Sequence, residues 1–196
     1  LSGAFGQQVS VNYSTANGTA TAGSDYTQIV SQTLVFEPGE TSKPVAVNIL
    51  GDYFIEPDET VLVNLTNAVN GTIFDAQGSG TLLNDDAAGV IQFDSAAYTV
   101  TEGTPNAVVT ITRTGGLAAG VSVEFFSNDG TARSGQDYQR VLGVFTFAPN
   151  EAAITINIPI LNDQIHEGDE TVTLALAAPT GGATLGLPIN AFLTIS

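Results

Sequence analysis

Hydrophobic and polar residues alternate with a period of two along much of this chain. Apolar side chains occupy every second position in residues 9–13, 61–65, 154–160 and 172–176, and mostly polar or small residues stand between them. Successive side chains of a β-strand point to opposite faces, so each segment is predicted to be a strand with one buried face. No segment has the 3.6-residue apolar period of an amphipathic helix.

Turn-forming dipeptides separate these segments. They are Asn17-Gly18, Pro38-Gly39, Asn70-Gly71, Gly115-Gly116, Asp129-Gly130 and Gly181-Gly182. Asn, Asp and Gly tolerate positive φ, and Pro pre-sets the φ angle of a turn. Many short strands with such turns between them predict an all-β sandwich or barrel.

The sequence contains one unit twice. NGTATAGSDY at 17–26 returns as DGTARSGQDY at 129–138, and VFEPGE at 35–40 returns as TFAPNE at 146–151. ILGDYFIEPDETV at 49–61 returns as ILNDQIHEGDETV at 160–172. Three blocks in the same order predict two homologous domains in tandem, which we place at 1–86 and 87–196.

The two copies do not begin and end at equivalent places. Residues 89–93 and 108–112 of the second copy, with Glu102 between them, have no counterpart in the first. The first copy ends in Asp85-Asp86, whereas the second stops at Ser196, before an equivalent acidic pair. We therefore expect the first domain to lack its initial strand, and the chain to be a window from a longer tandem array.

The composition excludes several classes of protein. The 196 residues include 20 Asp and Glu against 4 Lys and Arg, for a net charge of −16, yet 43% are hydrophobic and only 12% are charged. A disordered acidic tail would be poorer in apolar residues, and a nucleic-acid-binding protein needs a basic face. No apolar run is long enough to span a membrane. Without Cys, disulfides and zinc–thiolate sites are impossible.

Most of the acidic residues lie in loops at strand ends, in the repeated pattern D-x3-E-x-D-E at 52–59 and 163–170. Carboxylates that converge at one pole of a sandwich repel one another, so a cation is expected to offset the repulsion. Ca²⁺ takes six to eight oxygen ligands, whereas Mg²⁺ retains several waters, so an all-oxygen cluster favours Ca²⁺. The alternative, that these acids are solvated turn residues, remains open.

Taken together, the three repeated blocks resemble the Calx-beta domain, a repeat of sodium–calcium exchangers and of large bacterial surface proteins. The resemblance covers nearly the whole chain as two copies. It implies two seven-stranded immunoglobulin-like sandwiches with ions at one pole, and these metal ligands: Asp25, Asp52, Glu56, Glu59, Asp85, Asp86, Glu102, Asp137, Asp163, Glu167 and Glu170.

This chain departs from the family pattern at three positions. Gly51 and Asn162 stand where the family has an acidic residue, and Asn84 replaces the first member of an acidic triplet. Each predicted site therefore lacks a carboxylate. We expect the first site to bind better, because it retains Asp85 and Asp86.

The resulting hypothesis is a calcium-binding structural or adhesive repeat of a larger extracellular or cell-surface protein. Ca²⁺ would stabilise the pole of the sandwich and the junction between domains. Expected partners are calcium ions, neighbouring repeats, or another protein or glycan, with no nucleic acid and no membrane insertion. The alternative function is a metal-independent protein- or glycan-interaction module.

An enzyme is not expected. His166 is the only histidine, and no nucleophile motif accompanies it. Paired carboxylates could hydrolyse a glycosidic bond, but the chain has no Trp to form a sugar-binding platform.

Overall fold

The computed structural model describes residues 1–162 and 168–196, and in these residues every regular element is a β-strand. The all-β prediction is confirmed. In the described part of the chain, no helix is long and apolar enough to cross a membrane. The chain forms two compact units, which we call unit 1 (1–52 and 56–85) and unit 2 (53–55 and 86–196).

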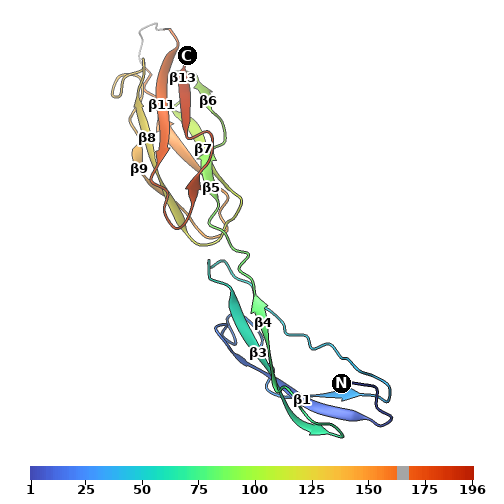
Figure 1. Ribbon diagram of the computed structural model, residues 1–196. Helices are drawn as coiled ribbons and strands as arrows, with labels where there is room; N and C mark the ends of the chain where they lie inside the picture. Colours follow the sequence, from blue (N-terminus) through green and yellow to red (C-terminus); the bar gives the residue numbers. More distant parts are fainter. Residues whose placement is uncertain (163–167) are drawn as a thin grey trace. The chain divides into compact units, whose positions relative to one another are not determined.

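Unit 2 is a sandwich of two sheets, drawn in green to red in Figure 1. One sheet has the order β10-β7-β5-β12 and the other has the order β6-β13-β11-β8-β9. The β5–β12 and β6–β13 pairs are parallel, and the other pairs are antiparallel. Its strands are β5 Val90–Phe93, β6 Ala97–Val100, β7 Asn106–Thr114, β8 Val121–Asp129, β9 Leu142–Phe147, β10 Ala153–Pro159, β11 Glu170–Ala177, β12 Thr184–Leu185 and β13 Asn190–Ile195.

The core of unit 2 lies between these two sheets. Strand β7 turns Val109 and Ile111 inward, and both side chains are fully buried. Phe93 of β5 packs edge-to-face on Phe125 of β8, with ring centroids 6.2 Å apart. The alternating pattern of the sequence is thus realised as one buried face on every long strand.

Unit 1 contains a single sheet, of order β2-β1-β3-β4, in which all neighbours are antiparallel. Its strands are β1 Val9–Asn17, β2 Gln32–Phe36, β3 Glu59–Val69 and β4 Gln77–Leu82. By the sequence repeat and the strand pairing, this sheet corresponds to β9-β8-β11-β13 of unit 2.

The second sheet of the sandwich is missing from unit 1 as described. Residues 42–48 repeat β10, but they form no strand. In unit 2, β10 pairs with β7, and the described residues of unit 1 contain no counterpart of β7. A strand without a neighbour has no partner for its backbone groups, so the segment stays irregular.

The core of unit 1 is correspondingly small. One buried cluster contains Val9, Val11 and Phe36, and a second contains Ala20, Tyr26 and Val61. The inner face of the sheet is only partly covered, because the layer that should cover it is incomplete.

Candidate metal centre

The loop between β1 and β2 positions Asp25. Asn17 at the end of β1 accepts hydrogen bonds through Oδ1 from the Ala22 amide at 3.0 Å and the Tyr26 hydroxyl at 2.8 Å. The Tyr26 side chain is fully buried and anchors the loop. The Asp25 carboxylate accepts a hydrogen bond from the Thr21 amide at 2.6 Å, which fixes its orientation.

The connection between β2 and β3 supplies two further acids. Glu59 is the first residue of β3, and Glu56 lies three residues before it. Asn84, just after β4, accepts a hydrogen bond from the Glu56 amide at 3.4 Å through Oδ1. In return, Asp58 Oδ1 accepts a hydrogen bond from the Asn84 amide at 2.9 Å. Asn84 therefore ties the Glu56 loop to the end of the neighbouring strand.

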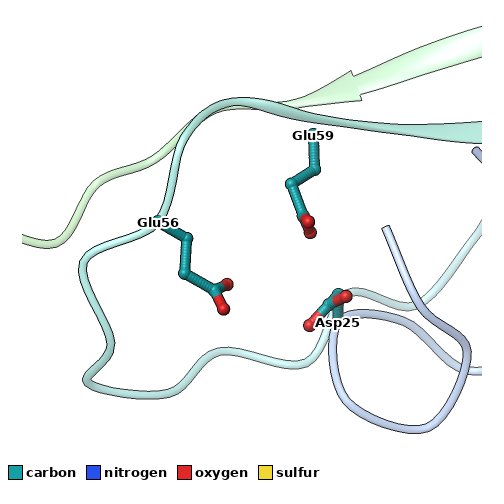
Figure 2. A group of neighbouring side chains, drawn as sticks. All are labelled: Asp25, Glu56 and Glu59. Atoms are coloured by element: carbon teal, nitrogen blue, oxygen red, sulfur yellow. The ribbon is translucent and has the colours of Figure 1, made fainter. Parts of the chain in front are cut away.

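These two loops bring Asp25, Glu56 and Glu59 together, and Figure 2 shows the three carboxylates pointing toward one another. One oxygen from each lies within 4.8 Å of the others. In the part of the chain that the structure describes, no other group of three or more His, Cys, Asp or Glu side chains comes this close. Glu56 is exposed, whereas Asp25 and Glu59 are partly buried.

The electrostatics of the cluster follow from these contacts. The hydrogen bond from the Thr21 amide, together with one from Ser24, lowers the pKa of Asp25 and keeps it ionised. Desolvation raises the pKa of Glu59, and the charges of Asp25 and Glu56 raise it further. The three acids therefore repel one another, and none of the side chains that form the cluster carries a positive charge.

The cluster fits a hard divalent cation. Calcium–oxygen distances are about 2.3–2.6 Å, so two oxygens bound to one ion lie up to about 5 Å apart. The three carboxylates already satisfy this limit. They would supply part of an all-oxygen shell, with the remaining positions left to carbonyls and water.

The sequence matches the Calx-beta domain family over residues 1–82 and 84–196. The chain belongs to the Calx-beta family. Sodium/calcium exchanger 1 of Canis lupus familiaris is 32% identical over 191 residues, which cover 87% of this chain and 20% of the exchanger. Sodium/calcium exchanger 2 of Homo sapiens is 32% identical over 187 residues, which cover 86% of this chain and 20% of the exchanger. The chain therefore spans about a fifth of the length of these relatives.

Solved structures agree with this assignment. The apo-form Calx CBD1 domain is 30% identical, with a TM-score of 0.51, and the match covers 54% of this chain and 96% of that domain. The CBD12 structure from CALX1.2 is 22% identical, with a TM-score of 0.54, and the match covers 99% of this chain and 90% of the CBD12 chain. The predicted Calx-beta resemblance and the predicted tandem immunoglobulin-like fold are confirmed.

Several acids predicted as ligands lie outside the cluster. In the first Calx-beta unit, Asp52 and Asp85 are exposed loop residues. In the second, Asp86 and Glu102 are partly exposed, and the Glu102 amide donates to the Ser196 carbonyl at 2.9 Å. Of the residues predicted for unit 1, the structure thus brings together only the three named above.

The second Calx-beta unit repeats the first loop closely. The Asp137 carboxylate accepts a hydrogen bond from the Arg133 amide at 2.6 Å, as Asp25 does from Thr21. Glu170 is the first residue of β11 and is partly buried, like Glu59. The predicted ligands Asp163 and Glu167 lie outside the described residues, as does His166.

Two residues near the cluster were not predicted to take part in it. Asp58 belongs to the repeated acidic pattern at 52–59, and Asn84 replaces an acidic residue of the family, yet their hydrogen bonds hold the Glu56 loop. The available signal was the position of Asn84 directly after β4, beside the start of β3 in the antiparallel pair.

Proposed function

We propose that this chain is a calcium-binding Calx-beta tandem module, and that Asp25, Glu56 and Glu59 of unit 1 hold an ion. The observation that carries the proposal is the approach of these three carboxylates to within 4.8 Å. An all-oxygen, all-carboxylate set favours Ca²⁺ over transition metals, which prefer nitrogen or sulfur ligands.

A bound ion would act as a clamp between two loops. Asp25 comes from the β1–β2 loop, and Glu56 and Glu59 come from the β2–β3 connection. Desolvation and the charges of Asp25 and Glu56 raise the pKa of Glu59, and a bound ion would offset the repulsion among these charges. Since it binds only where the loops are folded, it stabilises unit 1 by about 2.7 kcal/mol at a hundredfold excess over Kd.

The names of similar proteins support the choice of ion. Relatives are sodium/calcium exchangers, and one similar solved structure is the calcium binding domain CBD12 of CALX1.1. Transport is not part of the proposed function, because the chain covers only 20% of the exchangers.

Finer features remain proposals. We infer that the other described acids of the predicted ligand set add oxygens for further ions, namely Asp52, Asp85, Asp86, Glu102, Asp137 and Glu170. Domain limits at 1–86 and 87–196, an ion at the junction, an adhesive role, a place outside the cell, and the absence of enzymatic activity stay predictions.

Isothermal titration with Ca²⁺ tests the proposed site. The full chain is expected to release or absorb heat in a saturable manner, and Asp25→Asn is expected to remove the tightest step. Asp75→Asn is the matched control, because Asp75 is an exposed acid of unit 1 outside the cluster and its Oδ1 acceptor role toward Gln77 survives in Asn. Equal titrations for the two variants, or no saturable binding, would overturn the site.

The metal-independent interaction module is the second candidate function. It stays a prediction from the sequence. Absence of calcium binding in the same titration would leave this candidate in place.

A further inference from the structure

The five-stranded sheet of unit 2 carries a patch of apolar side chains on its outer face. Strands β8, β9, β11 and β13 turn alternate residues into the core, and the residues between them form this outer face. Its apolar members are Phe126, Leu142, Val144, Ala175 and Phe192, which we call the sheet-face patch.

The strand pairing makes the patch continuous. Phe126 lies opposite Leu142 on one side and opposite Ala175 on the other. Val144 follows Leu142 on the same face of β9, and Phe192 lies diagonally across from Ala175. Such direct and diagonal neighbours are about 5 to 8 Å apart, so the five side chains form one surface. Leu142, Val144 and Phe192 are 64%, 64% and 56% exposed on it.

The fold does not require apolar residues at these positions. Unit 1 contains the equivalent sheet, and the sequence repeat and the strand registers align the patch with five of its residues. These are Ser14, Ser31, Thr33, Asn64 and Ser79. All five are polar, as is usual for a sheet face that meets only water. The apolar residues of unit 2 therefore need a reason other than the fold.

The other outer face of unit 2, on β10-β7-β5-β12, is also mostly polar. It carries Thr110, Thr155 and Asn157. Among the described residues of these four strands, Val108 is the only large hydrophobic side chain that is exposed. The contiguous apolar surface is thus confined to one face of unit 2, as expected for a contact surface.

The sheet-face patch lies where the chain carries little charge. The net charge is −16, yet Glu124 is the only charged residue among the described strand residues of this outer face. A partner with a basic surface would be attracted to the acidic loops and not to this face. A second, equally neutral face meets it without a large charge conflict.

The outer face has the size that a weak dimer needs. Five strands about 4.8 Å apart, with about six residues of about 3.4 Å each, span roughly 24 by 20 Å, or about 500 Å² per copy. Two such faces bury about 1,000 Å², which is near the lower limit for a specific interface.

We propose that two copies of this chain associate through the sheet-face patch and form a weak dimer with twofold symmetry. Both copies present the same flat apolar surface, so one contact satisfies both. Two sheets pack face to face in this way inside β-sandwiches, about 10 Å apart. Phe126 and Phe192 contribute the largest side chains to the contact.

Sedimentation velocity of the full chain tests the association. The measurements are made in EDTA, so their outcome is independent of the proposed calcium site. Between about 10 μM and about 1 mM chain, the sedimentation coefficient is expected to rise from the monomer value toward the dimer value. Kd is expected to fall as NaCl is raised from about 20 to about 300 mM, because salt screens the repulsion between two acidic chains.

Substitutions that copy unit 1 test the patch without changing the net charge. Leu142→Ser combined with Phe192→Ser is expected to raise Kd by about tenfold or more, which corresponds to about 1.4 kcal/mol. Val144→Thr is expected to raise Kd about threefold. Its matched control is Val108→Thr, which changes a valine of similar exposure on the opposite face and is expected to leave Kd unchanged.

The unchanged chain provides a second measurement that needs no variant. Amide resonances of β8, β9, β11 and β13 are expected to shift as the chain concentration rises, whereas those of β7 and β10 stay constant. A chain that remains monomeric at about 1 mM, or a Kd that rises with salt, would overturn the proposal. So would equal effects of Val144→Thr and Val108→Thr, or shifts confined to the acidic loops.

Discussion

The two units contain the same repeat, yet the described residues form a two-sheet sandwich in unit 2 and a single sheet in unit 1. The β1–β2 loop of unit 1 and the β8–β9 loop of unit 2 bury equivalent tyrosines, Tyr26 and Tyr138. The hydroxyl of each tyrosine donates a hydrogen bond to the side chain nine positions earlier. The second layer differs between the described parts of the two units: β7 pairs with β10 in unit 2, and residues 42–48 of unit 1 have no such neighbour among the described residues. The loop is specified locally, whereas the second sheet depends on a partner strand far away in the sequence.

The largest expected difference is in the packing of equivalent core positions. Ile156 of β10 is 2% exposed, whereas its counterpart Val45 is only partly buried. Ile156→Ala is expected to lower the free energy of unfolding of unit 2 by about 2–5 kcal/mol, because it leaves a cavity. Val45→Ala is expected to cost unit 1 about 1 kcal/mol or less. Urea unfolding followed by amide resonances from each unit measures both, and equal losses would contradict the difference in closure.

Arg113 gives the next largest effect. It is 1% exposed and donates to the carbonyls of Ala88, Ala118 and Ala119, while desolvation lowers its pKa. The equivalent residue in unit 1 is Leu1, which is 46% exposed. Arg113→Leu therefore makes unit 2 resemble unit 1 and is expected to cost about 2–3 kcal/mol, because buried carbonyls lose a charged donor. Thermal unfolding monitored in unit 2 checks this, and an unchanged Tm would show that Arg113 is dispensable.

The acidic cluster gives unit 1 a pH dependence of its own. The pKa of Glu59 is raised from its ordinary value of 4.5, so the folded state binds this proton more tightly than the unfolded state. The contribution of Glu59 to stability therefore falls as pH rises from 4.5 through the raised pKa. Without divalent cations, Glu59→Gln is expected to raise the Tm of unit 1 at neutral pH and to flatten this slope.

The control for that experiment is Glu37→Gln, which removes one exposed acid of unit 1 outside the cluster. This variant is expected to keep the decrease in the Tm of unit 1 as pH rises above 4.5. With saturating Ca²⁺ the advantage of Glu59→Gln is expected to reverse, because the variant loses a ligand. An unchanged slope in Glu59→Gln would contradict the mutual repulsion of the cluster.

The smallest expected effect concerns a charge that only unit 2 has. Asp129 occupies the place of Asn17, and its pKa is lowered first by the hydrogen bond from Tyr138 and also by Arg140, 3.1 Å away. Its contribution to stability is present at neutral pH and is lost as pH falls through the lowered pKa. Asp129→Asn keeps the acceptor and is expected to cost less than Arg113→Leu, because the ion pair is partly exposed. The Tm of unit 2 measured as a function of decreasing pH tests this. An equal loss of Tm at low pH in Asp129→Asn and in the unchanged chain would contradict the stabilising role of the Asp129 charge.

The sequence pattern predicted the fold class well because its signals are local or repeated. The period-two segments at 9–13, 61–65, 154–160 and 172–176 all lie in or overlap strands, and the family assignment is confirmed. The repeat also aligned 42–48 with β10. Whether such a segment forms a strand depends on a hydrogen-bonding neighbour, which the residues of the segment do not specify.

The candidate site was only partly predictable for the same reason. The Calx-beta resemblance included Asp25, Glu56 and Glu59 in its predicted set of eleven ligands, without separating these three from the others. The pattern could not separate these from Asp52, which lies outside the cluster. Nor could it show that Asn84 positions the Glu56 amide, because that hydrogen bond joins residues from different strand ends.

Amide hydrogen exchange in the free chain tests the difference between the units most directly. We expect fast exchange at the amides of Lys43, Val45 and Val47, which have no described backbone acceptor. We expect slow exchange at those of their counterparts on β10, Ile154, Ile156 and Ile158. Comparable protection of the two sets would show that residues 42–48 are paired in solution, and would contradict the difference between the units.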